Sequence, residues 1–149
     1  GLIHSCCDMG FEMPGVYAKI NFRSTGLTWD FDQYTPDVVT ISLGQNDGIQ
    51  DSTTFCSAYV SFINQIRNHY PDAVLILLNS PMADNSLNSV LVEYTNAVTE
   101  YFNGHGDTKV YAFELSHSLN SGCGYHPSMA QHETIADELT AYIQTLMGW

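Results

Sequence analysis

The chain has 149 residues, a length that fits one domain, and 4 Lys and Arg stand against 16 Asp and Glu, for a formal net charge of −12 at pH 7. That charge argues against nucleic acid or an anionic membrane as a partner, because few cations are present to neutralise phosphates. Hydrophobic residues make up 44% of the sequence, enough for a packed core, and no apolar run approaches the roughly 18 residues that span a bilayer. We therefore expect one globular domain over residues 1–149.

The N-terminal quarter of the chain carries few signals of regular structure. Residues 1–37 contain Pro14, Gly15 and Gly26, and they predict only a short helix around residues 16–20. No positively charged, apolar leader of the signal-peptide kind is visible, and a mature secreted protein has the same appearance.

Three short apolar runs, at residues 38–43, 73–78 and 110–113, predict strands. Each run is nearly continuous rather than alternating, as in strands that are buried on both faces of a parallel sheet. The segments at 55–66, 87–101 and 135–146 have apolar residues at helical spacing, and Ser128 and Gln131 have capping-box spacing ahead of the last one. This alternation predicts a doubly wound, three-layer α/β/α fold with a parallel sheet, in which functional side chains follow the carboxyl ends of the strands.

The segment after the first predicted strand reads Gly44-Gln45-Asn46-Asp47-Gly48. Gly44 allows the backbone to turn away from the sheet, and Asn46 then offers a neutral amide donor of the kind that stabilises an oxyanion. An ordinary Asn-Asp-Gly turn between strand and helix is the competing interpretation.

After the third predicted strand, His126 precedes Pro127 at the entry of the last helix. Proline holds the preceding residue extended and suits a helix start, so the imidazole is expected at the same sheet edge as Asn46. A histidine there can act as a general base near neutral pH, whereas a capping or packing role is the alternative.

Cysteines and histidines give no metal-binding pattern. The cysteines are Cys6, Cys7, Cys56 and Cys123. No pair has Cys-x-x-Cys spacing, which leaves either buried small hydrophobes or a disulfide from Cys123 to Cys6 or Cys7 in an oxidising compartment. His126 and His132 are six residues apart, a poor spacing for two ligands on one helical face, so we expect no metal and no cofactor.

The order of these elements resembles the SGNH (GDSL-type) hydrolases, whose third and fifth sequence blocks are similar to the strand-Gly-x-Asn-Asp and His-Pro elements here. Further segments of the sequence are similar to the acetyl-xylan esterases of carbohydrate esterase family 2. The matching segments are residues 29–31, 34–37, 70–73, 79–82 and 147–149. The resemblance implies a flavodoxin-like fold and a secreted or periplasmic enzyme that removes acetyl groups from xylan-type plant polysaccharide. It also implies His126 as general base, Asn46 in the oxyanion hole, Gly44 shaping that loop, and Asp47 tying the loop together.

The chain departs from this pattern in two places. No Gly-Asp-Ser occurs in the sequence, so the resemblance implies a nucleophile upstream of residue 1, on the same polypeptide or on a bound N-terminal fragment. The resembled sheet has five strands and only three are readable here, so we expect the domain to be incomplete at its N-terminus. Three residues before the histidine, where the resembled pattern has an aspartate, this chain has Cys123. That departure suits a Ser–His dyad in which a backbone carbonyl orients the imidazole.

Two other functions remain open. A carbohydrate-binding module can use the same cleft without catalysis, with Tyr125, Trp29 and Trp149 as candidate sugar-stacking platforms and Tyr125 the best placed. An inactive hydrolase fragment is the third possibility. Ser5, Ser42 and Ser128 are the nearest substitutes for the nucleophile, but Ser42 falls in a predicted strand and Ser128 at a predicted helix cap.

Overall fold

The computed structural model describes residues 1–5, 9–23 and 26–149. Its sheet has three parallel strands in the order β1 (Val38–Ser42), β2 (Val74–Leu78) and β3 (Val110–Phe113). Val38 of β1 lies opposite Val74 of β2, and Leu75 of β2 lies opposite Val110 of β3. The predicted parallel strands are confirmed, with one residue lost at the end of β1 and one at the start of β2.

Three long helices alternate with the strands, as the apolar spacing predicted. They are α2 (Ser52–His69), α3 (Asn85–Gly104) and α4 (Met129–Met147). Each begins at a polar N-cap, in turn Asp51, Asp84 and Ser128, whose side chain accepts a hydrogen bond from a first-turn backbone N–H. Ser128 and Gln131 form the predicted capping box. No helix among the described residues is long and apolar enough to cross a membrane.

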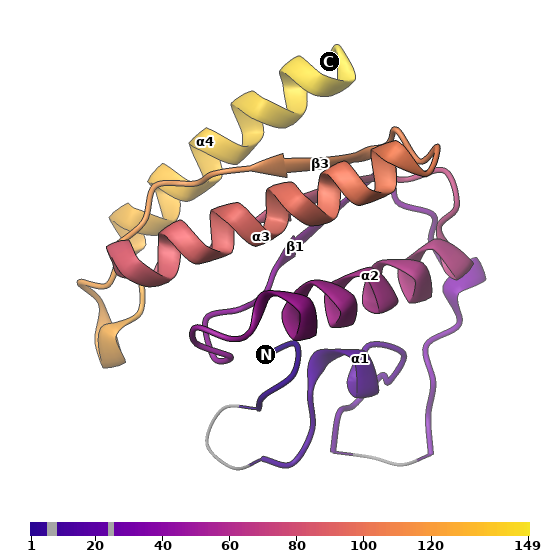
Figure 1. Ribbon diagram of the computed structural model, residues 1–149, viewed down its shortest axis with the longest axis horizontal. Coiled ribbons are helices and arrows are strands. Elements are labelled where there is room, and N and C mark those ends of the chain that lie inside the picture. Colours follow the sequence, from indigo (N-terminus) through magenta and orange to yellow (C-terminus); the bar gives the residue numbers. More distant parts are fainter. Residues whose placement is uncertain (6–8, 24–25) are drawn as a thin grey trace.

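The helices cover both faces of the sheet (Figure 1), which confirms the three-layer fold. Helices α2 and α3 pack against the face that carries Ile41, Leu75 and Leu77. Helix α4 packs against the opposite face, where it meets Ile76 and Leu78. The helix α4 has no fully buried residue, whereas α2 and α3 bury five and six.

The N-terminal helix was predicted in the wrong place. The chain forms α1 over Met13–Val16 rather than over residues 16–20. Pro14 in the first turn fixes a helical φ and sets the start earlier. Lys19 instead makes an antiparallel bridge to Thr28, which ends the helix before residue 20. Two short 3-10 helices, η2 (Phe31–Gln33) and η3 (Cys123–Tyr125), complete the regular structure of the described residues.

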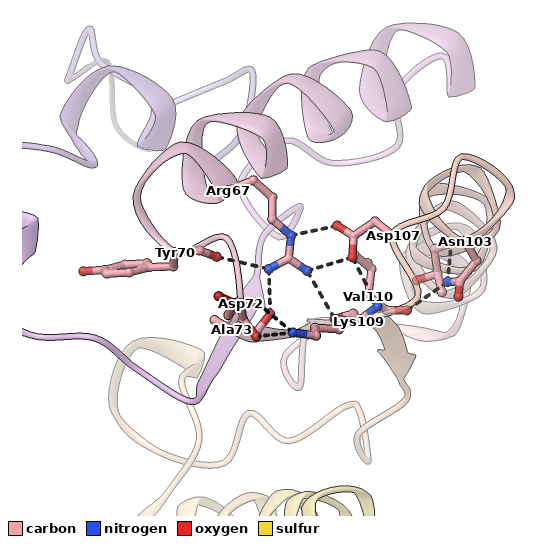
Figure 2. Close-up of polar contacts among 9 residues, drawn as sticks. Arg67, Tyr70, Asp72, Ala73, Asn103, Asp107, Lys109 and Val110 are labelled. Carbon is pink, nitrogen blue, oxygen red and sulfur yellow. Dashed lines mark hydrogen bonds and ion pairs between the residues drawn. The ribbon is translucent and has the colours of Figure 1, made fainter.

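An arginine fastens the amino end of the sheet (Figure 2). Arg67, at the end of α2, forms a two-point ion pair with Asp107, with Nε–Oδ2 at 2.7 Å and Nη2–Oδ1 at 3.1 Å. Its Nη1 also donates to the carbonyl oxygens of Tyr70 at 3.2 Å and Ala73 at 2.6 Å. The guanidinium therefore joins α2 to the segments that enter β2 and β3, at the end of the sheet opposite the candidate site.

Candidate active site

The loops that follow β1 and β3 lie at the carboxyl edge of the sheet (Figure 1), because all three strands run parallel. Asn46 belongs to the first loop and His126 to the second, and both side chains are exposed. Strand β2 lies between the two strands, which are therefore roughly 10 Å apart at a spacing of about 4.8 Å per strand. Asn46 and His126 thus belong to loops that leave the sheet at the same edge.

Gly44 sits where no other residue fits well. Its φ of +118° is outside the range of ordinary side-chain-bearing residues. A Cβ at this position would lie 2.3 Å from Cδ2 of Leu91 and 3.3 Å from Cζ of Phe55. The carbonyl of Gly44 accepts hydrogen bonds from the backbone N–H groups of Asp47 and Gly48, both at 3.1 Å. These contacts turn the chain tightly through Asn46 and leave its side chain exposed.

Asp47 joins this loop to the N-terminal segment. Its carboxylate is buried, and Oδ1 accepts hydrogen bonds from the backbone N–H groups of Leu2, Ile3 and His4 at 2.9, 2.6 and 2.8 Å. Oδ2 also accepts from Leu2 at 2.8 Å. Three successive backbone donors thus surround one carboxylate, which places residues 2–4 beside the Asn46 loop.

His126 is held by its own loop and not by a carboxylate. Nδ1 lies 2.9 Å from the carbonyl oxygen of Gly124. A carbonyl oxygen only accepts, so Nδ1 carries the proton and Nε2 is left as the basic nitrogen. Gly124 and Tyr125 both have left-handed backbone, with φ of +61° and +59°, and for tyrosine this costs of order 1 kcal/mol. The Tyr125 side chain is 82% exposed and directly precedes His126 in the loop.

The sulfur atoms take no part in the arrangement that orients His126. Cys123 is exposed and bonds to no other cysteine among the described residues, and its carbonyl oxygen accepts a 3.3 Å hydrogen bond from the His126 backbone N–H. Cys56 likewise bonds to no other cysteine among these residues, and burial, with Glu93 nearby, raises the pKa of its thiol. The disulfide considered from the sequence, between Cys123 and Cys6 or Cys7, involves residues outside the described part of the chain. Within residues 1–5, 9–23 and 26–149, no group of three His, Cys, Asp or Glu side chains could hold a metal ion.

A buried asparagine that sequence reasoning missed fixes the loop after β3. Asn79 donates from Nδ2 to the carbonyl oxygen of Leu115 at 2.9 Å and accepts from the Leu115 N–H at 2.7 Å. Its Nδ2 also donates to Oδ1 of Asn88 at 2.6 Å. The sequence signal that could have identified Asn79 is its place directly after an all-apolar strand, at the sheet edge where functional side chains were expected. Next to it, Ser80 donates to Oε1 of Gln45 at 2.5 Å and so ties the loops after β1 and β2 together.

A hollow of about 240 Å³ adjoins Asn46. Seven further residues line it: Gly1, Met9, Phe11, Glu12, Met13, Val16 and Phe22. The wall is largely apolar, with Glu12 as its charged side chain. Asn46 therefore lines a hollow that is formed mainly by the N-terminal segment.

The sequence pattern of the family described as GDSL-like Lipase/Acylhydrolase matches residues 17–139. Among curated proteins, the chain is 37% identical over 131 residues to the cellulase/esterase CelE of Acetivibrio thermocellus, covering 84% of this chain and 16% of that protein. It is 27% identical over 143 residues to an acetylxylan esterase / glucomannan deacetylase of Cellvibrio japonicus, covering 93% of this chain and 39% of that protein. The chain therefore spans well under half the length of these curated relatives.

Solved structures agree with the fold. A carbohydrate esterase family 2 enzyme with a carbohydrate-binding domain, from Corynascus, superposes with a TM-score of 0.85 at 26% identity, covering 100% of this chain and 50% of that one. A family two carbohydrate esterase from Clostridium thermocellum, in complex with cellohexaose, superposes with a TM-score of 0.79 at 37% identity, covering 84% of this chain and 40% of that one.

Proposed function

Because the chain belongs to the GDSL-like lipase/acylhydrolase family, we propose that it carries the base and oxyanion part of a serine esterase that deacetylates xylan-type plant polysaccharide. Carbohydrate esterases among the relatives support the substrate class. One observation is the main support for the proposal. Nδ1 of His126 is hydrogen-bonded to a backbone carbonyl, which leaves Nε2 free to act as a base at the sheet edge that also carries Asn46. We propose a secreted or periplasmic location.

In the proposed mechanism, Nε2 of His126 takes the proton of the serine hydroxyl as its oxygen attacks the ester carbonyl. The Gly124 carbonyl accepts from Nδ1–H throughout and stabilises the imidazolium that forms. The Asn46 amide donates to the oxyanion of the tetrahedral intermediate, where a neutral donor stabilises developing charge. The imidazolium then protonates the departing sugar oxygen, and water attacks the acetyl-enzyme by the reverse sequence. Tyr125 offers its exposed ring to the sugar.

We further propose that the serine is carried by a strand that pairs with the free edge of β1. Within the described residues β1 pairs with β2 alone, and Thr40 and Ser42 are exposed while β2 is buried along most of its length. A groove of about 210 Å³ follows this edge. Its lining comprises Met13, Tyr17, residues 39–43, Phe62 and Ile66.

A buried hydroxyl beside that groove supports the same proposal. The Tyr17 hydroxyl is buried with no hydrogen-bond partner in the described part of the chain. Burial, with Tyr70 nearby, raises its pKa to about 12. An unsatisfied buried hydroxyl is costly, and the backbone of an added strand would supply the missing partner. The same strand would complete the unpaired edge of β1 and place its carboxyl end near Asn46.

The test uses the natural polypeptide that contains this chain and measures acetate released from acetylated xylan. Asn46→Ala is expected to lower kcat about 10²- to 10³-fold. Asn96→Ala, at an exposed position on α3, is the matched control and should leave kcat unchanged. Equal kcat for Asn46→Ala and the control would contradict the oxyanion role.

The competing function, a carbohydrate-binding module, is favoured by one feature, the 82% exposure of the Tyr125 side chain in the loop that carries His126. It predicts a different outcome in the same experiment. The natural polypeptide would bind xylan in a pull-down assay and lose that binding on Tyr125→Ala, while releasing no acetate.

A further inference from the structure

The loop that carries His126 has little contact with the core, so its shape depends on hydrogen bonds within it. Residues 122–126 form a tight turn in which the Gly122 N–H donates to the His126 carbonyl at 2.7 Å. A Cβ on Gly122 would lie 2.8 Å from that carbonyl oxygen. The imidazole itself is exposed and is anchored through Nδ1 to the Gly124 carbonyl. Its direction therefore follows the backbone of the loop.

One side chain, Gln131, closes this loop at both ends. Its Oε1 accepts hydrogen bonds from the Ser121 N–H at 3.0 Å, from the Ser121 hydroxyl at 2.8 Å and from the Ser128 N–H at 2.9 Å. Ser121 precedes the turn and Ser128 follows it, so a single oxygen joins the two flanks of the histidine loop. The Gln131 N–H in turn donates to the Ser128 hydroxyl at 3.4 Å.

We propose that Gln131 is a positioning residue, which holds the His126 loop in the shape that keeps Nδ1 on the Gly124 carbonyl and Nε2 free to act as base. A capping box alone needs only the Ser128 contacts. The two additional bonds to Ser121 reach beyond the helix and serve the loop. This inference rests on the proposed function for its kinetic consequence, whereas the effect on the imidazole tautomer is independent of catalysis.

Three variants separate positioning from helix stability. Gln131→Met keeps the length of the side chain and removes the oxygen acceptor. Gln131→Glu restores an acceptor at the same place. Gly148→Ala is the matched control, because it strains the other end of α4, where Gly148 has a φ of +73° and an added Cβ would meet no atom within 4 Å.

The first measurement is imidazole ¹⁵N NMR of the natural polypeptide, which reports which ring nitrogen of His126 bears the proton. We expect an Nδ1–H tautomer in the wild type, Gln131→Glu and Gly148→Ala, and a mixture of tautomers in Gln131→Met. If Gln131→Met keeps the wild-type tautomer, the positioning role is wrong, whether or not the protein is an esterase.

The second measurement is the kinetics of ester hydrolysis by the same four proteins. Gln131→Met should lower kcat by about 10²-fold, the loss expected when a catalytic group moves by an ångström, with KM little changed. Gln131→Glu should recover most of kcat, and Gly148→Ala should match the wild type. An equal loss in Gln131→Met and Gly148→Ala would show that the effect is helix stability and would overturn the proposal. Absence of activity in the wild type, with the tautomer result intact, would contradict the proposed function alone.

Discussion

Replacing Asp47 with alanine should release the N-terminal segment from the Asn46 loop. The carboxylate accepts from the backbone N–H groups of Leu2, Ile3 and His4, and the change leaves all three without that acceptor. A hydrogen bond to a charged group contributes about 1.5–3 kcal/mol, and the loss is largest where the donor stays buried. Leu2 is 2% exposed, whereas the bonds of Ile3 and His4 are partly buried, so those two donors can be rehydrated. With about 2 kcal/mol for the bond of Leu2 and about 0.5–1 kcal/mol for each of the other two, the sum is about 3–4 kcal/mol.

Hydrogen exchange of the backbone amides in the natural polypeptide is the direct assay, with urea unfolding alongside it. In Asp47→Ala the amides of residues 2–4 should exchange at least about 10²-fold faster, since 1.4 kcal/mol corresponds to a factor of ten. Asp47→Asn keeps one acceptor oxygen and should lie between the wild type and Asp47→Ala. Slow exchange at residues 2–4 in Asp47→Ala, equal to the wild type, would refute the argument that the carboxylate holds this segment.

Two further pairs of substitutions, one at each end of the sheet, are tested by urea unfolding. Arg67→Lys should lower the free energy of unfolding by about 2–3 kcal/mol, because an ammonium cannot reproduce both the two-point pairing with Asp107 and the hydrogen bonds to the carbonyl oxygens. Its control, Lys109→Met, removes the exposed ion pair with Asp72 and should change the free energy of unfolding by less than about 1 kcal/mol. Gly44→Ala should lower the free energy of unfolding by about 3 kcal/mol or more, because the φ of Gly44 is +118° and the added Cβ meets packed side chains. Its control, Gly48→Ala, should lower it by about 1 kcal/mol, because Gly48 has a φ of +65° and open space for the added Cβ. Equal losses within either pair would contradict these structural assignments.

The strands and long helices could be predicted because their signals are local. The run at β2 is apolar throughout and is buried in the centre of the sheet, and Ser128 with Gln131 forms the capping box that its spacing predicted. The position of the short α1 was predicted wrongly because two influences act on this segment. Proline favours a start at Met13, and the pairing of Lys19 with Thr28 depends on how the following segment returns.

The candidate site was predictable in position more than in detail. The sheet edge for Asn46 and His126 follows from parallel strands alone. The backbone N–H groups that donate to Asp47 were not predictable, because they belong to Leu2, Ile3 and His4, which are separated from Asp47 by 43 to 45 positions in the sequence. The contacts of Asn79 with Leu115, 36 positions apart, depend in the same way on the folded chain. Long-range hydrogen bonds of this kind leave no periodic pattern in the sequence.

The central claim is that His126 is the general base for a serine outside these 149 residues, and organophosphate labelling with mass spectrometry tests it most directly. In the natural polypeptide, a fluorophosphonate should modify one serine in a Gly-Asp-Ser sequence, and His126→Ala should slow that modification by about 10²-fold or more. A modified Ser5, Ser42 or Ser128, or a labelling rate that His126→Ala leaves unchanged, would contradict the account.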